Sequence, residues 1–391
     1  MYLFNPDNDL ALANFSANYT APASAALMAQ ELALLPLWYA RGASVIAEGE
    51  ENHLFLRSVN EIFPLSSRLV PFSEIRLHPG EVIIPWGWNP SLRKRLLTQG
   101  VPQELLPTMD DLTRLRHYSG RQHAVRILRE LQAEVPTFSG ESHYFTSLDE
   151  LLAYLSSFPG NKLLKMPLSG SGKGLIRILD AITGKQTDWC RRVIREQGGV
   201  VAEPVLNKVE DFAMEFYLNQ GASRFAGYSL FRSASSGAYM GSELLCDRRI
   251  EERLSAFIPI TLLHRLCDAL LEMLAASFPF YTGYAGVDMM ICESEEGYRV
   301  QPCVEINMRM NMGMVARLFH DQYMEVEGQG RFRVEYYKQP GNALLFHQKM
   351  ERDYPLVVKN EKISSGYLPL TPVTEDTRYI AYVVVPRSTM K

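Results

Sequence analysis

The chain has 391 residues, of which 47% are hydrophobic and 21% charged, a composition typical of a globular protein with room for two or three domains. A formal net charge of −4 provides no broad basic surface, so we expect no nucleic-acid partner. No apolar run reaches the roughly 18 residues that cross a bilayer, and the N-terminus lacks a basic segment followed by an apolar stretch. We therefore expect neither a membrane association nor a secretion signal.

Five cysteines are present, an odd number without any C-x-x-C spacing. That pattern argues against a disulfide framework and against a zinc site, and we expect reduced thiols in a cytoplasmic protein.

Residues 1–112 mix short apolar runs with helical stretches, which indicates a small Rossmann-like α/β domain. Two polar segments follow apolar runs. Asn5–Asp9 either binds an amino group of a ligand or serves as a turn and helix cap, and capping is the favoured alternative. Trp86–Asn89 either forms an aromatic wall for a ligand or packs inside the protein.

Residues 113–325 begin with a helix from about Arg121 to Gln132, then a short predicted strand Val135–Phe138 and a helix Ser147–Ser156. A strand, Lys162–Met166, leads into a loop containing Gly170, Gly172 and Gly174. A second strand, Leu175–Leu179, follows this loop.

The loop Ser169-Gly170-Ser171-Gly172-Lys173 follows Lys165, which ends the preceding strand. Glycine lets backbone N–H groups approach phosphate oxygens, so the strand, loop, strand order predicts a flap over a nucleotide. The Walker pattern does not fit, because Gly174 stands where that motif has Ser or Thr. A simple mobile hairpin turn is the alternative.

The segment Val200–Val205 predicts a strand that ends at Pro204. The C=O of Glu203 and the N–H of Val205 are an acceptor and a donor two residues apart, which matches the edge of adenine. An ordinary strand stopped by proline is the other interpretation.

A hairpin over 285–309 carries polar side chains at alternate positions. Alternate residues of a strand share a face, so Glu305, Asn307 and Arg309 project together, and an antiparallel return places Asp288 near Glu305. Carboxylate and amide oxygens without His or Cys suit Mg²⁺. An ordinary half-exposed strand would also alternate in this way. Past 325, residues 326–391 predict a strand-rich closing subdomain.

Taken in order, Lys165, the glycine loop, the Glu203–Val205 edge, Asp288 and the Glu305-x-Asn307-x-Arg309 motif resemble the ATP-grasp superfamily over roughly residues 115–320. The resemblance implies an α+β fold in which two subdomains clamp ATP, with a nucleotide flap at about 160–200 and a metal hairpin at 285–309. It implies that two Mg²⁺ ions bind Asp288, Glu305 and Asn307, and that Lys165 and Arg309 contact phosphates.

The same resemblance places a ribose-binding carboxylate at Glu210 or Asp211, and the sequence leaves that choice open. Most relatives carry a second phosphate-binding lysine before the first strand of this fold, where the present chain offers Arg121. A guanidinium differs in geometry from an ammonium group.

The activity implied is an ATP- and Mg²⁺-dependent ligase that joins a small-molecule carboxylate to an amine through an acyl phosphate. Arg232 binds either a substrate carboxylate or the γ-phosphate in this scheme, or is a solvated loop residue. A kinase acting on a small molecule and a non-catalytic ATP-binding module are the alternatives, and a homodimer stays open.

Overall fold

The computed structural model describes residues 1–170, 172–234 and 237–387, and it divides into two compact units. Unit 1 contains Met1–Leu112, Tyr239–Ile250 and the described residues from Met310 on; unit 2 contains Thr113–Ala238 and Glu251–Arg309. Both units draw on separate stretches of the chain, so the division into three consecutive domains at 112/113 and 325/326 stays a prediction. Over the described ranges, no helix is long and apolar enough to cross a membrane.

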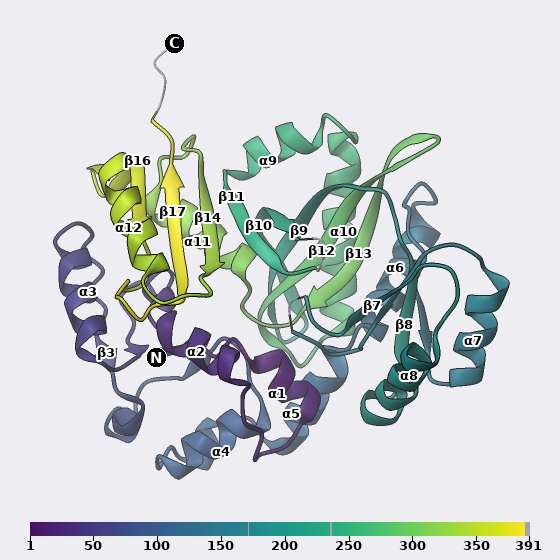
Figure 1. Ribbon diagram of the computed structural model, residues 1–391, viewed down its shortest axis with the longest axis horizontal. Coiled ribbons are helices and arrows are strands. Elements are labelled where there is room, and N and C mark those ends of the chain that lie inside the picture. The colour runs from purple at the N-terminus through teal and green to yellow at the C-terminus, as the bar shows by residue number, and fades with distance from the viewer. Residues whose placement is uncertain (171, 235–236, 388–391) are drawn as a thin grey trace. The chain divides into compact units, whose positions relative to one another are not determined.

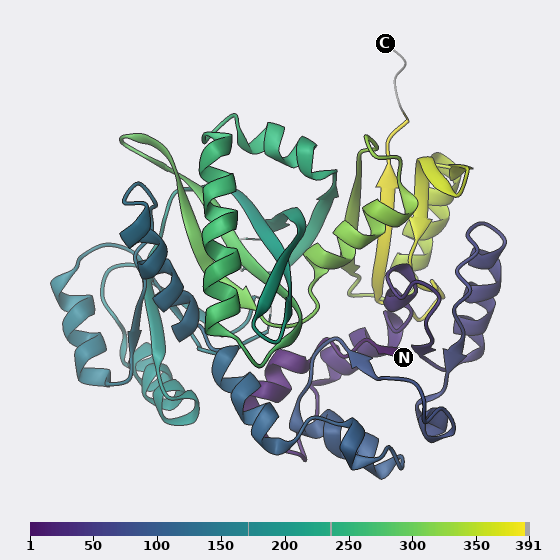
Figure 2. The ribbon, with the colours of Figure 1, turned by 180° about the vertical axis from the view of Figure 1, so that it is seen from behind.

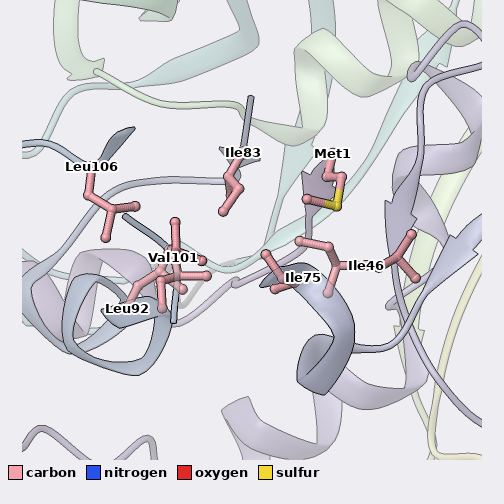
Figure 3. Close-up of a cluster of buried hydrophobic side chains, with 9 residues drawn as sticks. Met1, Ile46, Ile75, Ile83, Leu92, Val101 and Leu106 are labelled. Atoms are coloured by element: carbon pink, nitrogen blue, oxygen red, sulfur yellow. The ribbon is translucent and has the colours of Figure 1, made fainter. Parts of the chain in front are cut away.

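Unit 1 begins with the predicted α/β arrangement (Figure 1). Its four short strands pair in parallel in the order β3-β2-β1-β4. The strands are β1 (Tyr2–Leu3), β2 (Val45–Ile46), β3 (Leu69–Val70) and β4 (Ile84–Pro85), and the helices around them are α1 (Asn8–Asn14), α2 (Ala23–Glu31), α3 (Glu50–Asn60), α4 (Pro90–Thr98) and α5 (Met109–Tyr118) with 3₁₀ turns Leu35–Trp38, Phe72–Leu77 and Gln103–Leu105. Apolar side chains from these elements form a buried cluster, seven of whose members are labelled in Figure 3.

The polar segments after β1 and β4 bind each other. The Asn5 amide donates to the Gly87 carbonyl at 2.8 Å, and Asn89 bonds Asn8 at 3.0 Å while its oxygen caps α4 through the Leu92 N–H. A Cβ on Gly87 would lie 2.2 Å from the Asn8 side chain, so this approach requires glycine. Asn5–Asp9 forms a turn, as predicted, closed by the Asn8 N–H and the Asn5 carbonyl at 3.2 Å. The predicted capping by this segment is wrong, because α1 has no side-chain cap among the described residues, and the cap is Asn89 on α4.

Unit 1 is completed by the C-terminal part of the chain. An antiparallel sheet has the order β11-β14-β17-β16-β15. Its strands are β11 (Tyr239–Leu244), β14 (Gly330–Tyr336), β15 (Val357–Lys359), β16 (Lys362–Pro369) and β17 (Tyr379–Val385), with helices α11 (Met312–Tyr323) and α12 (Asn342–Asp353). Helix α9 (Asp247–Leu254) begins in unit 1, and its residues from Glu251 on belong to unit 2. The buried Trp38 indole donates to the Leu370 carbonyl at 2.7 Å, which ties this part to the N-terminal residues.

Unit 2 holds two antiparallel sheets, β5-β8-β6-β7 and β13-β12-β9-β10. The first comprises β5 (His143–Phe145), β6 (Lys162–Lys165), β7 (Leu175–Ile178) and β8 (Val200–Pro204), with helices α6 (Gln122–Glu134), α7 (Leu148–Ser157) and α8 (Gly184–Gln197) in the same unit. The second comprises β9 (Lys208–Asn219), β10 (Ala222–Ser233), β12 (Thr282–Ser294) and β13 (Gly297–Asn307). Helix α10 (Ile260–Ser277) crosses one face of this second sheet, as Figure 2 shows.

Local sequence explains these elements. Helix α8 starts at a capping box, in which Thr183 and Gln186 bond each other's backbone, and ends at Gly198 in the left-handed conformation. Helix α10 buries Leu263, Leu266, Leu270 and Leu274, the spacing of one helical face. The predicted strand Val135–Phe138 is wrong. The segment is a turn in which the Phe138 N–H donates to the Val135 carbonyl. Pro136 has no N–H that could donate a hydrogen bond to a neighbouring strand.

We expect Leu92→Ala to lower the free energy of unfolding by about 2–5 kcal/mol, because Leu92 is 3% exposed in the cluster of Figure 3 and its truncation leaves a cavity. Calorimetry of purified protein measures the loss. Leu105→Ala is the control, since Leu105 is 53% exposed and should change the stability by less than about 0.5 kcal/mol. Equal losses in both variants would contradict this description of the core.

Candidate active site

The β12–β13 hairpin of unit 2 places the predicted metal ligands on one face of the sheet. Asp288 lies directly opposite Glu305, and Gly286 lies opposite Asn307. The intervening residues Val287, Met289 and Ile306 are buried on the other face. The Asn307 amide donates to Asp288 at 3.0 Å, so the side chains of facing strands meet. Gly286 adds no side chain between them.

Sequence reasoning missed a third carboxylate on this face, that of Glu215. Strand β9 pairs with β12, with Glu215 opposite Gly286 and Ala213 opposite Asp288. Glu215 is 1% exposed and accepts a hydrogen bond from Ser229 at 3.1 Å. The sequence does contain an indication of this residue, because Glu215 is a single carboxylate inside the apolar run Phe212–Leu218 and charged side chains are rarely buried unless they are paired.

Arg121 connects this face to the base of the glycine loop. One guanidinium nitrogen donates to both carboxylate oxygens of Glu305 at 2.8 Å. Another donates to the Met166 carbonyl at 2.6 Å and to the Ser169 hydroxyl at 2.9 Å. Arg121 is 7% exposed, so this is a buried, forked ion pair.

A second buried ion pair joins the other predicted phosphate-binding cation to the predicted adenine edge. The Lys165 ammonium lies 2.5 Å from one Glu203 oxygen, and the Ser142 hydroxyl donates to the other at 2.9 Å. Lys165 and Glu203 are 5% and 8% exposed. Arg121 and Lys165, two of the cations assigned to phosphate, therefore have a protein carboxylate as partner in the ligand-free chain.

The carboxylates of the sheet face differ in their electrostatics. Burial would raise the pKa of Glu305, but the charge and hydrogen bonds of Arg121, helped by Lys165 and Arg309, hold that pKa below its usual value. Burial together with the charges of Glu305 and Glu215 raises the pKa of Asp288 well above its usual value, although Asn307 and Arg309 oppose this. The two facing carboxylates therefore respond in opposite directions to the same surroundings.

The donor set fits Mg²⁺. It offers hard oxygens only, and a bound cation would offset the repulsion among Asp288, Glu305 and Glu215. Within the described ranges, no group of three or more His, Cys, Asp or Glu side chains lies close enough to hold a metal ion. The predicted set has two carboxylates and one amide, so water and phosphate oxygens would have to complete the coordination, as is usual for Mg²⁺.

The glycine loop connects antiparallel β6 and β7, an arrangement that fits both the predicted flap and a simple hairpin turn, so the flap stays a prediction. Gly172 and Gly174 have φ of +67° and +70°, and a Cβ on Gly174 would lie 2.7 Å from the Ser169 Cβ. The Lys173 N–H donates to the Gly170 carbonyl at 2.9 Å, and the Lys173 side chain is exposed. Ser171, also predicted to bind nucleotide, lies outside the described residues.

One of the two backbone groups predicted to bind adenine already has a partner within the protein. The Val205 N–H donates to the Asn161 carbonyl at 3.0 Å, because the end of β8 continues its pairing beside β6, so this donor is already used. The next amide, that of Leu206, has no hydrogen-bond partner in the described part of the chain.

The two ribose candidates lie on opposite faces of β9. Asp211 shares the face of Glu215 and accepts hydrogen bonds from Lys208 and Ser233, each at 2.5 Å. Glu210 projects to the other face and pairs with Arg253 at 3.0 Å.

The two remaining predicted arginines are less buried than Arg121. Arg309 follows β13 and donates to the Asn307 side chain at 3.0 Å, so it stays beside the metal ligands. Arg232 lies near the end of β10, where its side chain is exposed.

Comparison with known proteins shows which fold this is. Neither the family models nor the curated proteins gave a match. Among solved structures, Staphylococcus aureus N5-carboxyaminoimidazole synthetase matches with a TM-score of 0.53 and 11% identity over 91% of this chain and 91% of that one. Campylobacter jejuni biotin carboxylase matches with 0.53 and 12% over 99% and 87%. Rhizobium etli pyruvate carboxylase matches with 0.54 and 10% over 91% of this chain and 35% of that one.

These neighbours are ATP-grasp enzymes. The chain has the ATP-grasp fold. The fold prediction is thereby confirmed, with a parallel α/β sheet in unit 1 and antiparallel sheets in unit 2. At 10–12% identity the likeness concerns the fold, so the activity has to be argued from the site.

In metal-free buffer, Asp288→Asn should raise the melting temperature at about pH 7.5 by roughly 2 °C or more. A carboxyl with a raised pKa stabilises the fold only below its usual pKa and loses that contribution as pH rises through the folded-state pKa, so its ionised form is unfavourable at neutral pH. The gain should disappear toward about pH 4, which thermal melts across a pH series would record.

Glu305→Gln is the matched control on the same face and should have the opposite sign. Its pKa is lowered, so its contribution to stability is present above its usual pKa and lost as pH falls through the folded value. The variant should therefore melt below wild type at about pH 7.5. Shifts of the same direction in both variants would contradict this electrostatic description.

Proposed function

We propose that the protein is an ATP- and Mg²⁺-dependent ligase that joins a small-molecule carboxylate to an amine and releases ADP. The observation that carries the proposal is the placement of Asp288, Glu305 and Asn307 on one sheet face, beside Arg121, in a chain with the ATP-grasp fold. Acidic oxygens that bind divalent cations and basic groups that bind phosphate are the two requirements of phosphoryl transfer.

Each cluster of residues has a role in this proposal. Asp288, Glu305 and Asn307 would hold Mg²⁺, which when bound neutralises phosphate charge and orients the transferred group. Arg121 and Lys165 would bind phosphate oxygens. Arg309, held beside Asn307, would stabilise the anion that forms when the amine attacks the acyl phosphate.

The nucleotide base would lie at the end of β8. The Glu203 carbonyl would accept from adenine, and Leu206, rather than Val205, would donate an N–H, because the Val205 N–H already bonds Asn161. Asp211 is the better ribose ligand of the two candidates, since it shares the sheet face of Glu215 while Glu210 pairs with Arg253. The flap Ser169–Lys173 would close over the phosphates and exclude water from the acyl phosphate.

The reaction needs little covalent participation by the protein. A carboxylate oxygen of the first substrate attacks the γ-phosphorus of ATP and ADP leaves. The neutral amine then attacks the acyl carbon, the C–O bond to phosphate breaks, and the nitrogen loses a proton as the amide forms and phosphate leaves. Positioning and charge neutralisation carry both steps. We propose small-molecule acid and amine substrates and a cytoplasmic location, with Arg232 as a candidate contact for the substrate acid. Whether the enzyme works as a homodimer stays open.

A pool of acids should reveal the activity through ADP release that depends on both an acid and an amine. The pool should contain amino acids, dipeptides and bicarbonate, the last because the three solved neighbours are named as carboxylases or as a carboxyaminoimidazole synthetase. Glu305→Ala should lower the rate by at least about 10²-fold, because one metal-binding carboxylate is lost. Glu295→Ala, an exposed change in the turn of the same hairpin, should leave the rate unchanged. Unchanged ADP release by Glu305→Ala would refute the site.

Hydroxylamine separates a ligase from the two alternatives. With hydroxylamine in place of the amine, an acyl phosphate gives a hydroxamate, which iron(III) detects by colour. A kinase acting on a hydroxyl group would release ADP without forming hydroxamate, and a non-catalytic module would bind ATP without releasing ADP.

A further inference from the structure

The guanidinium of Arg121 occupies the position beside Glu305 that a cation would take. We infer that Arg121 is an internal counter-cation that blocks Glu305 from divalent metal until nucleotide phosphates draw the guanidinium away. This inference rests on the proposed function and adds to it an order of binding: the metal enters with, or after, the nucleotide.

The ion pair is well formed in the ligand-free chain. Both Glu305 oxygens accept from the same Arg121 nitrogen at 2.8 Å, and the arginine is buried while the Glu305 side chain is 29% exposed. A divalent cation bound to these oxygens would lie close to the positive guanidinium. Because like charges at such short range repel strongly, the metal and Arg121 compete for Glu305.

The other two predicted metal ligands have different partners. The Asp288 carboxylate accepts from the neutral Asn307 amide, not from a cation. The Asn307 side-chain oxygen accepts from Arg309 at 3.0 Å, so a metal at that oxygen would lie beside a second guanidinium. Of the two carboxylates, Glu305 is the one that requires an exchange of a cationic partner for the metal, and Lys165, paired with Glu203, has a comparable restraint.

Arg121 also has an unused donor. Its Nε is buried and has no hydrogen-bond partner in the described part of the chain. The neighbouring Nη1 is held by the Met166 carbonyl and the Ser169 hydroxyl, which fix the arginine at the base of the glycine loop. A phosphate delivered under that loop would satisfy the idle donor and supply an anion that replaces Glu305.

Binding of Mn²⁺ without nucleotide tests the inference, with the hexaaquo electron paramagnetic resonance signal reporting free metal. Arg121→Gln should bind Mn²⁺ at least about tenfold more tightly than wild type, a typical size for coupling between two sites. The gain should be lost in Arg121→Gln with Glu305→Gln. Arg126→Gln, on the solvent side of the same helix α6, is the matched control and should equal wild type. Equal affinities in wild type and Arg121→Gln would overturn the inference.

A reciprocal measurement stands if Arg121→Gln does not fold, as judged by circular dichroism. In buffer with EDTA, calorimetric titration should show that Glu305→Gln binds metal-free ADP at least about tenfold more tightly than wild type, because Arg121 is released. Glu295→Gln, an exposed change of the same type in the turn of the same hairpin, should change the ADP affinity by less than about threefold. Equal gains in both variants would indicate a general charge effect and would overturn the inference.

The outcomes separate this inference from the proposed function. If wild type releases ADP with acid and amine but Arg121→Gln gains no Mn²⁺ affinity, the exchange is wrong and the ligase stands. If wild type binds neither ADP nor ATP with Mg²⁺ present, both are wrong.

Discussion

The two-residue repeat of β9, β12 and β13 is the constraint on which the rest of the site depends. Residues at even steps along each strand fill the core under α10, and residues between them bring Glu215, Asp288, Glu305 and Asn307 to the opposite face. A shift of one residue in the register would bury the carboxylates and expose the core. The hydrophobic face therefore fixes the acidic face, and folding and function use the same alternation.

The acidic face of the sheet places like charges close together, which opposes the stability of the fold. Three carboxylates lie on neighbouring strands, and Glu305 accepts a forked hydrogen bond from Arg121 there. Burial and the charges of Glu305 and Glu215 raise the pKa of Asp288, and a bound cation would favour its ionised form. Like charges placed close together in a buried position are expected at binding sites, where ligand binding as well as stability determines which residues are present. In the ligand-free chain, the ion pairs Arg121–Glu305 and Lys165–Glu203 reduce the repulsion between the carboxylates.

The sequence was informative where a pattern had a strict period. The hairpin alternation predicted Asp288 near Glu305, and the structure sets them directly opposite. The fold was predictable because its motifs follow one another in order along the chain. Long-range partners were not predictable: nothing near Arg121 in sequence indicates Glu305, 184 positions away, and nothing near Val205 shows that Asn161 takes its amide. Glu215 was missed because only the pairing of β9 with β12 brings it to the acidic face. Val135–Phe138 was misassigned because a proline in a short apolar run fits a turn as well as a strand.

A crystal structure with Mg²⁺ and a non-hydrolysable ATP analogue tests the central claim most directly. The account predicts metal coordinated by oxygens of Asp288, Glu305 and Asn307 together with phosphate oxygens, and it predicts that Arg121 has left Glu305 for a phosphate. A nucleotide bound away from this sheet face, or one bound there while Arg121 still holds a metal-free Glu305, would contradict it.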